Sequence, residues 1–223
     1  MIAVVDYHKG NLKSVERGLA AVGGEVTVTD DAETIARADA VVLPGVGAFA
    51  DASGTMLRLG QMDAIRGRIV AGVPFLGICL GLHLMFEEGV EGASAGGEMG
   101  SGRNAPGLAV LPGVVEAIPR VDAAGRAYKV PHVGWNTIVP VSDVPGFESP
   151  LLAGIDPGEH FYFTHSYIAP LGSFAVAQTT HSVTFPSVVC YGDVAFGVQF
   201  HPEKSSDAGA AVLRNFVELT KGA

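Results

Sequence analysis

The first half of the chain alternates short apolar runs with amphipathic stretches, and this alternation limits the possible folds more than any other feature. Four apolar runs predict buried strands, at residues 2–5, 25–29, 40–43 and 73–78. Helical spacing of apolar side chains predicts three helices, over residues 11–22, 56–70 and 80–88. Strands that alternate with helices imply right-handed crossovers and a mostly parallel sheet.

The second half has a different pattern. Residues 92–107 are rich in Gly, Ser and Ala and predict a flexible surface loop. Runs with period-two alternation then predict strands that extend the sheet in an antiparallel or mixed manner, at residues 110–117, 161–167, 174–179, 187–191 and 195–200. A last helix is expected over residues 207–220, with Ser205 or Ser206 as its cap. Without internal repeats, the prediction is one α/β domain spanning residues 1–223.

Charge and composition argue against several classes of protein. A formal net charge of −9 leaves no basic stripe for a nucleic-acid backbone. The longest apolar runs, such as residues 38–45, are far shorter than the ~20 residues that span a bilayer. The first six residues have no basic region and do not suggest a signal peptide. The two cysteines, Cys79 and Cys190, are expected to be reduced thiols of a cytoplasmic protein.

The most specific local pattern is Gly77-Ile-Cys-Leu-Gly81, between a predicted strand and a predicted helix. This is the cysteine form of the nucleophile elbow, in which flanking glycines allow a turn too tight for a Cβ atom. The helix N-terminus beneath Cys79 would favour the reactive thiolate, and the Leu80 amide would point toward a developing oxyanion. The alternative is a buried structural cysteine, which we expect for Cys190.

A thiol nucleophile needs a base, and the base needs an orienting partner. His201 and Glu203 lie on the same side of an extended chain, and Pro202 disfavours the helical region for His201. The alternative is a solvated pair at a strand end. His83, one helical turn after Cys79, is a rival base without an equally placed carboxylate. The sequence contains none of the familiar metal-binding spacings, so neither a metal nor a cofactor is expected.

Taken together, these motifs resemble the class I, or triad, glutamine amidotransferases. The marks of the family are Pro44-Gly-Val-Gly47, Gly77-Ile-Cys-Leu-Gly81 and His201-Pro-Glu203. Within the family, further segments resemble the glutaminase subunits of imidazole glycerol phosphate synthases: Asp6-Tyr-His-Lys-Gly-Asn-Leu-Lys-Ser-Val15, Lys129-Val-Pro-His-Val-Gly-Trp-Asn136, Phe161-Tyr-Phe-Thr-His-Ser-Tyr167 and Phe196-Gly-Val-Gln-Phe-His-Pro-Glu-Lys-Ser205. The motifs follow the family's order over nearly the whole chain, which implies a flavodoxin-like α/β fold with a nucleophile elbow.

The resemblance also implies a role for each matching residue. Cys79 would be the nucleophile, His201 the general base and then acid, and Glu203 the residue that orients it. The implied oxyanion donors are the amide of Leu80 and one from the turn at Val46 and Gly47. The implied glutamine-binding residues are His83, Glu91, Ser166 and Tyr167, with His83 standing where the family has Gln. The implied partner interface and ammonia gate comprise Asn11, Trp135, Asn136 and Lys204.

The implied reaction is hydrolysis of glutamine to glutamate and ammonia through a thioester. Ammonia would pass, sheltered from water, to a (β/α)8-barrel cyclase subunit in a heterodimer. That subunit would make imidazole glycerol phosphate and aminoimidazole carboxamide ribotide, in histidine biosynthesis. Two other functions remain open. One is a stand-alone cysteine hydrolase acting on γ-glutamyl bonds, and the other is a catalytically silent module that binds glutamine and regulates a partner.

Overall fold

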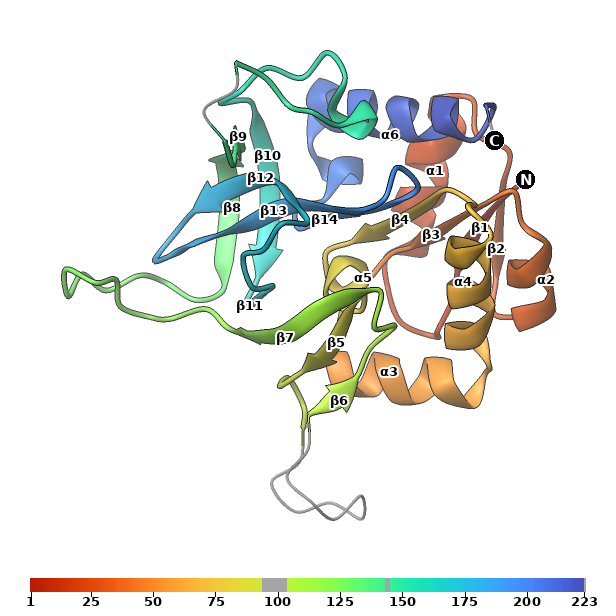
Figure 1. Ribbon diagram of the computed structural model, residues 1–223, viewed down its shortest axis with the longest axis horizontal. Coiled ribbons are helices and arrows are strands. Elements are labelled where there is room, and N and C mark those ends of the chain that lie inside the picture. The colour runs from red at the N-terminus through yellow and green to blue at the C-terminus, as the bar shows by residue number, and fades with distance from the viewer. Residues whose placement is uncertain (94–103, 143–144, 223) are drawn as a thin grey trace.

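The centre of the molecule is an eight-stranded mixed sheet (Figure 1). The computed structural model describes residues 1–93, 104–142 and 145–222. Across the sheet the strands are β2 (Val26–Thr29), β1 (Ile2–Val5), β3 (Ala40–Leu43), β4 (Phe75–Ile78), β14 (Ala195–Val198), β13 (Thr184–Tyr191), β12 (Ala175–Thr180) and β9 (Val139–Pro140). The first five run parallel and the last three pair antiparallel. The predicted fold class, a mostly parallel sheet with an antiparallel extension, is confirmed.

Both faces of this sheet are covered, because successive strand residues point to opposite sides. Val4 packs in a cluster with α1 (Leu12–Ala21) and α6 (Ser206–Leu219). Its neighbour Val5 packs in the opposite cluster, with α2 (Ala32–Arg37), α3 (Phe49–Arg58) and α4 (Gln61–Val70). The buried strands therefore form the middle layer of a three-layer structure, which fixes the positions of the strand ends.

Two smaller sheets lie beside the central one (Figure 1). The four-stranded sheet has the order β11 (Tyr167–Ile168), β7 (Leu111–Ala117), β5 (Phe86–Gly89) and β6 (Ala105–Pro106). The two-stranded sheet pairs β10 (His160–His165) with β8 (His132–Thr137) in antiparallel register. The amide of His201, just after β14, donates to the Tyr162 carbonyl of β10. This bond ties the second sheet to the end of the central one.

Several predicted elements differ from the structure. The single helix predicted over residues 56–70 is two helices, because Gly60 takes a left-handed conformation between α3 and α4. The helix predicted over residues 80–88 ends early: α5 spans only Leu80–His83, and β5 follows. Pairing of β5 with β7 replaces the helical continuation there. The run at residues 161–167 is two strands separated at Ser166.

Other elements were not predicted, notably α2 and β8. Of the loop predicted over residues 92–107, residues 94–103 lie outside the described part, and β6 falls within the remainder. Cys190 is half-buried at the margin of the core rather than inside it. Across the described residues, the helices are all too short or too polar to cross a bilayer.

Candidate active site

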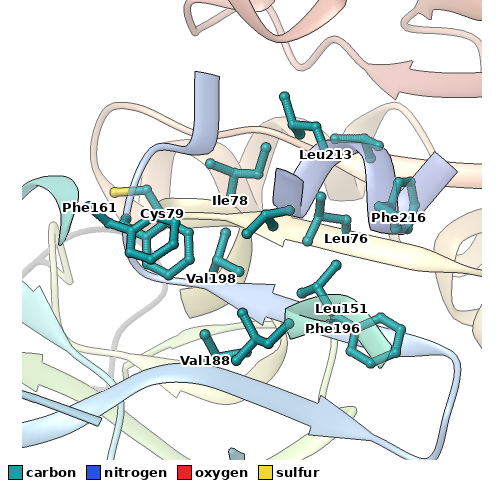
Figure 2. Packing of buried hydrophobic residues seen from close by; sticks show 14 of the residues in the cluster. Leu76, Ile78, Cys79, Leu151, Phe161, Val188, Phe196, Val198, Leu213 and Phe216 are labelled. Carbon is teal, nitrogen blue, oxygen red and sulfur yellow. The ribbon is translucent and has the colours of Figure 1, made fainter. Parts of the chain in front are cut away.

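Cys79 lies at the sharp turn between β4 and α5. Its backbone has φ 54° and ψ −105°, a conformation that residues other than glycine rarely adopt. A Cβ atom at Gly77 would lie 2.5 Å from the Gly81 carbonyl oxygen, and one at Gly81 would overlap the Leu43 carbonyl. Both glycines are therefore required by close backbone approach. Figure 2 shows Cys79 at the edge of the core cluster beside Phe161, with its sulfur directed away from Ile78 and Val198.

The Cys79 side chain is held on two sides. The thiol contacts the Thr164 carbonyl oxygen at 3.8 Å, and the Gln199 Nε2 group donates to the sulfur at 3.7 Å. The Cys79 amide donates to the Val198 carbonyl at 2.8 Å, which joins the end of β4 to the end of β14. With 7% of its surface exposed, the cysteine is buried but not sealed. The helix expected beneath it has only four residues, so its dipole contributes less than a long helix would.

His201 follows β14 on the strand next to Cys79, and it contacts Glu203. The Nδ1 atom of His201 lies 2.8 Å from Oε1 of Glu203, and both side chains are buried. This geometry leaves Nε2, which has no hydrogen-bond partner among the described residues, as the nitrogen available to Cys79. Glu203 belongs to the short 3-10 helix η2 (Pro202–Lys204), so the pair meets across a turn and not along an extended strand as predicted.

The surroundings of His201 favour its protonated form. Burial alone lowers the pKa of His201, but the neighbouring Cys79 sulfur and the Glu203 carboxylate together raise it to about 9. An imidazolium beside the sulfur stabilises negative charge on that sulfur. The arrangement therefore suits a cysteine nucleophile and a histidine that holds a proton ready for a leaving group.

Ser205 supports the histidine. It occupies the N-cap position of α6, as predicted, but its side chain does not cap the helix. Instead, its hydroxyl donates to the His201 carbonyl oxygen at 2.7 Å and accepts from the Tyr162 amide at 3.0 Å. The serine thus fixes the turn that carries His201 and Glu203.

A cavity of about 260 Å³ opens beside Cys79. Its walls come from the turn after β3, from α5, and from the segment between β10 and β11. The lining includes all seven residues expected from the sequence to bind substrate or an oxyanion, namely Val46, Gly47, Leu80, His83, Glu91, Ser166 and Tyr167. The structure therefore brings together residues that lie up to 121 positions apart in the chain.

Two side chains of this cavity have altered acidity. Burial lowers the pKa of His83 to about 4, so the ring is neutral near pH 7. Its Nε2 atom lies 2.7 Å from Oε1 of Gln199. Burial raises the pKa of Glu91, whose carboxylate accepts from the Phe49 amide at 3.1 Å. A neutral donor and a partly buried carboxylate thus face the same cavity.

The two expected oxyanion donors differ in availability. Leu80 is the first residue of α5, where an amide has no acceptor within the helix. The Val46 amide, in contrast, donates to the hydroxyl of the fully buried Tyr7 at 3.2 Å. The adjacent Gly47 has φ +106°, so this turn depends on glycine. In the observed conformation, Val46 is therefore already engaged.

The four residues expected at a partner interface have different surroundings. Trp135 is 54% exposed and packs edge-on against Tyr162, its cross-strand neighbour. The Lys204 amine lies 5.9 Å from the centre of the Tyr162 ring. Asn136 is half-buried and donates to the Thr180 carbonyl oxygen at 3.0 Å. Asn11 is exposed at the start of α1, and α1 packs against η2, which carries Lys204.

Sequence analysis missed four contributors to the site: Tyr7, Thr164, Gln199 and Ser205. Tyr7 and Gln199 occur in the motifs quoted above, but their contacts join segments 39 and 120 residues apart. Such contacts leave no periodic signal in the sequence. In the described part of the chain, no three His, Cys, Asp or Glu side chains are grouped as a metal site requires.

Comparison with known proteins gives consistent results. The family model described as glutamine amidotransferase class-I matches residues 3–219. The imidazole glycerol phosphate synthase subunit HisH of Moorella thermoacetica is 45% identical over 226 residues, covering 100% of this chain and 96% of that protein. The subunit of the same name from Caldanaerobacter subterraneus is 39% identical over 223 residues, covering 99% of both chains. A solved glutamine amidotransferase has a TM-score of 0.69 at 22% identity, covering 99% of this chain and 98% of the other, which supports the fold alone.

Proposed function

The chain belongs to the class-I glutamine amidotransferase family, and we propose that it is the glutaminase subunit of an imidazole glycerol phosphate synthase. The observation that carries the catalytic part of this proposal is the placing of Cys79 and the buried His201–Glu203 pair at the ends of two adjacent parallel strands. We further propose that residues 1–223 form one domain of a cytoplasmic enzyme.

In the first half of the reaction, the Cys79 sulfur attacks the side-chain amide carbon of glutamine, and its proton resides on His201. Charge develops on the amide oxygen, where the Leu80 amide and one amide of the Val46–Gly47 turn stabilise it. Since Val46 is held by Tyr7, use of the Val46 amide requires that hydrogen bond to open. His201 then transfers its proton to the leaving nitrogen, ammonia departs, and a thioester remains on Cys79.

In the second half, water attacks the thioester carbon while His201 accepts a proton from that water. The tetrahedral intermediate collapses, glutamate leaves, and the thiol is restored. Glu203 accepts the Nδ1–H of His201, which directs Nε2 to the reacting atoms. Glu91, His83, Ser166 and Tyr167 line the cavity and are the residues that we assign to the α-amino and carboxylate ends of glutamine.

The ammonia released at Cys79 is passed to a (β/α)8-barrel cyclase subunit. We assign the docking face to the exposed Trp135, the Lys204–Tyr162 contact and the exposed Asn11 at the start of α1. Tryptophan and tyrosine are enriched among the residues that contribute most to binding at protein interfaces. Asn136 is tied to Thr180 and to His132, so it supports this face from beneath.

The direct test is glutamate release from glutamine by this chain alone, and by the chain with a cyclase subunit and the ligand of that subunit. We expect the complex to couple glutamine hydrolysis to formation of imidazole glycerol phosphate. Glutamate release with no effect of the cyclase would favour a stand-alone hydrolase. No release under any of these conditions would favour a silent glutamine-binding module.

A further inference from the structure

Gln199 is a fully buried polar residue that the mechanism above does not use. It follows β14 and precedes His201 by two positions. Its backbone amide donates to the Ser187 carbonyl at 2.9 Å, which anchors the residue to β13. The two ends of its side-chain amide then face two functional groups: Nε2 faces the Cys79 sulfur at 3.7 Å, and Oε1 faces His83 Nε2 at 2.7 Å.

The contact with His83 determines which end of the amide faces the sulfur. Burial keeps the imidazole neutral near pH 7, so the ring carries a single N–H group. In the tautomer that carries this proton on Nε2, His83 donates to Oε1 of Gln199. The amide is then fixed with its NH2 group toward Cys79. A reversed amide would place a carbonyl oxygen against the sulfur and would repel a thiolate.

We propose that Gln199 stabilises the Cys79 thiolate through an Nε2–H···Sγ hydrogen bond, and that His83 acts as a positioning residue by fixing the orientation of the Gln199 amide. Gln199 therefore serves the nucleophile directly, because it touches the reacting sulfur. An N–H donor favours the anion over the neutral thiol, since hydrogen bonds to charged acceptors are the stronger kind. The inference deepens the proposed function, on which its catalytic meaning rests.

The hydrogen bond between His83 and Gln199 also gives His83 a structural role at its position in α5. The ring reaches Gln199 and lines the glutamine cavity, so one side chain contacts both the substrate site and the group that holds the nucleophile. The Tyr167 backbone, which lines the same cavity, is the other hydrogen-bonding neighbour of the ring. His83 is thus assigned to the support of Cys79 in addition to the wall of the cavity.

The test is the pH dependence of Cys79 alkylation by iodoacetamide, followed by peptide mass spectrometry on the intact chain. We expect Gln199→Leu to raise the midpoint of that profile by about one pH unit, which makes alkylation roughly tenfold slower near pH 7. Gln199→Glu keeps an acceptor for His83 but places an anion beside the sulfur, so the midpoint rises further. His83→Leu frees the amide and shifts the midpoint in the same direction, whereas His83→Gln restores a donor to Oε1 and returns it toward the wild-type value.

Two controls separate this effect from general loss of structure. Cys190, half-buried in the same chain, is the internal reference: a variant that opens the fold changes the Cys190 profile as well, whereas a local effect at Cys79 leaves that profile as in the wild-type chain. Gln61→Leu removes another fully buried glutamine, whose side chain donates to the Asp6 and Asp30 carbonyl oxygens and, among the described residues, has no hydrogen bond to Cys79. We expect this variant to leave the Cys79 profile unchanged. If the Cys190 profile shows that Gln199→Leu opens the fold, the Cys79 profile of Gln199→Glu tests the proposed hydrogen bond instead.

An unchanged or accelerated Cys79 reaction in Gln199→Leu and Gln199→Glu, with Cys190 unaffected, would overturn the inference. The measurement requires neither glutamine nor a partner. A chain whose Cys79 behaves as expected but that releases no glutamate, either alone or with the cyclase subunit and its ligand, would refute the proposed function and leave this inference intact.

Discussion

Replacing Glu203 by Gln removes the charge beside His201 while preserving the shape of the side chain. The pKa of His201 is raised from its ordinary 6.5 to about 9. A histidine with a raised pKa stabilises the fold fully below pH 6.5, and this contribution is lost as pH rises through 9. The difference corresponds to about 3 kcal/mol of unfolding free energy between pH 6 and 9.5.

Cys79 and Glu203 share that effect, and both lie against a ring that is only 3% exposed. We therefore expect Glu203→Gln to remove about 1–2 kcal/mol of the pH-dependent stability. The assay is urea unfolding at pH 6 and pH 9.5 for both proteins. Taking the difference between the proteins cancels the titration of other groups, such as Tyr7 and Cys190.

Glu33→Gln is the matched control, because Glu33 forms an exposed pair with Arg37 at 3.5 Å. Such pairs contribute about 0.3–0.5 kcal/mol and should leave the pH dependence unchanged. If Glu203→Gln shows the same loss of stability between pH 6 and 9.5 as the wild-type protein, the carboxylate does not hold the His201 proton. The assignment of Glu203 as orienting residue would then fail.

The His201–Glu203 pair, the glycine at position 81 and the buried histidines each allow a further test. His201→Ala should lower kcat/KM for glutamine by about 10⁴-fold or more, and Glu203→Gln should lower it by less. The reason is that the base moves the proton, whereas its partner only orients the ring. A larger loss in Glu203→Gln would reverse the two roles. Gly81→Ala should destabilise the fold in urea by several kcal/mol, on the order of the largest point-mutant effects, because its Cβ would overlap the Leu43 carbonyl. The control is Gly67→Ala in the open interior of α4, which should stabilise the fold by about 0.5–1 kcal/mol. Equal effects of the two substitutions would contradict the elbow geometry. Between pH 7 and pH 5, stability should fall by about 2 kcal/mol because of His83, since burial lowers its pKa to about 4 and only the unfolded chain takes up a proton in that range. His132, whose pKa is also lowered, should contribute less because its ring is less completely enclosed. A His83→Gln variant with an equally steep decline would exclude His83 as a source.

The parallel core was predictable because strands buried on both faces are continuous apolar runs. Residues 2–5 and 40–43 were placed correctly for that reason, and the elbow was predictable from two glycines around Cys79. The short α5 was not, because Leu82, Met85 and Phe86 recur at helical spacing and continue the pattern past His83. Only pairing with β7 makes Phe86–Gly89 a strand. The break at Gly60 was missed because a helix interior tolerates an isolated glycine.

Within the site, the sequence indicated which residue types were needed, but it could not show their mutual contacts. The bonds from Tyr7 to Val46 and from Gln199 to Cys79 depend on how distant segments meet across the sheet. Ser205 illustrates the same limit. It was predicted as a helix cap from its position, but its hydroxyl bonds to His201 and Tyr162 because the turn after β14 lies against β10.

The central claim is that Cys79 makes ammonia in this chain and that the cyclase subunit uses it elsewhere. The most direct measurement compares Cys79→Ala with the wild-type chain, each in complex with the cyclase, using either glutamine or ammonium salts as the nitrogen source. We predict that Cys79→Ala abolishes glutamate release and glutamine-dependent synthesis, while synthesis from ammonium salts continues at the wild-type rate. Equal loss of both activities, or glutamate release that survives the substitution, would contradict the account.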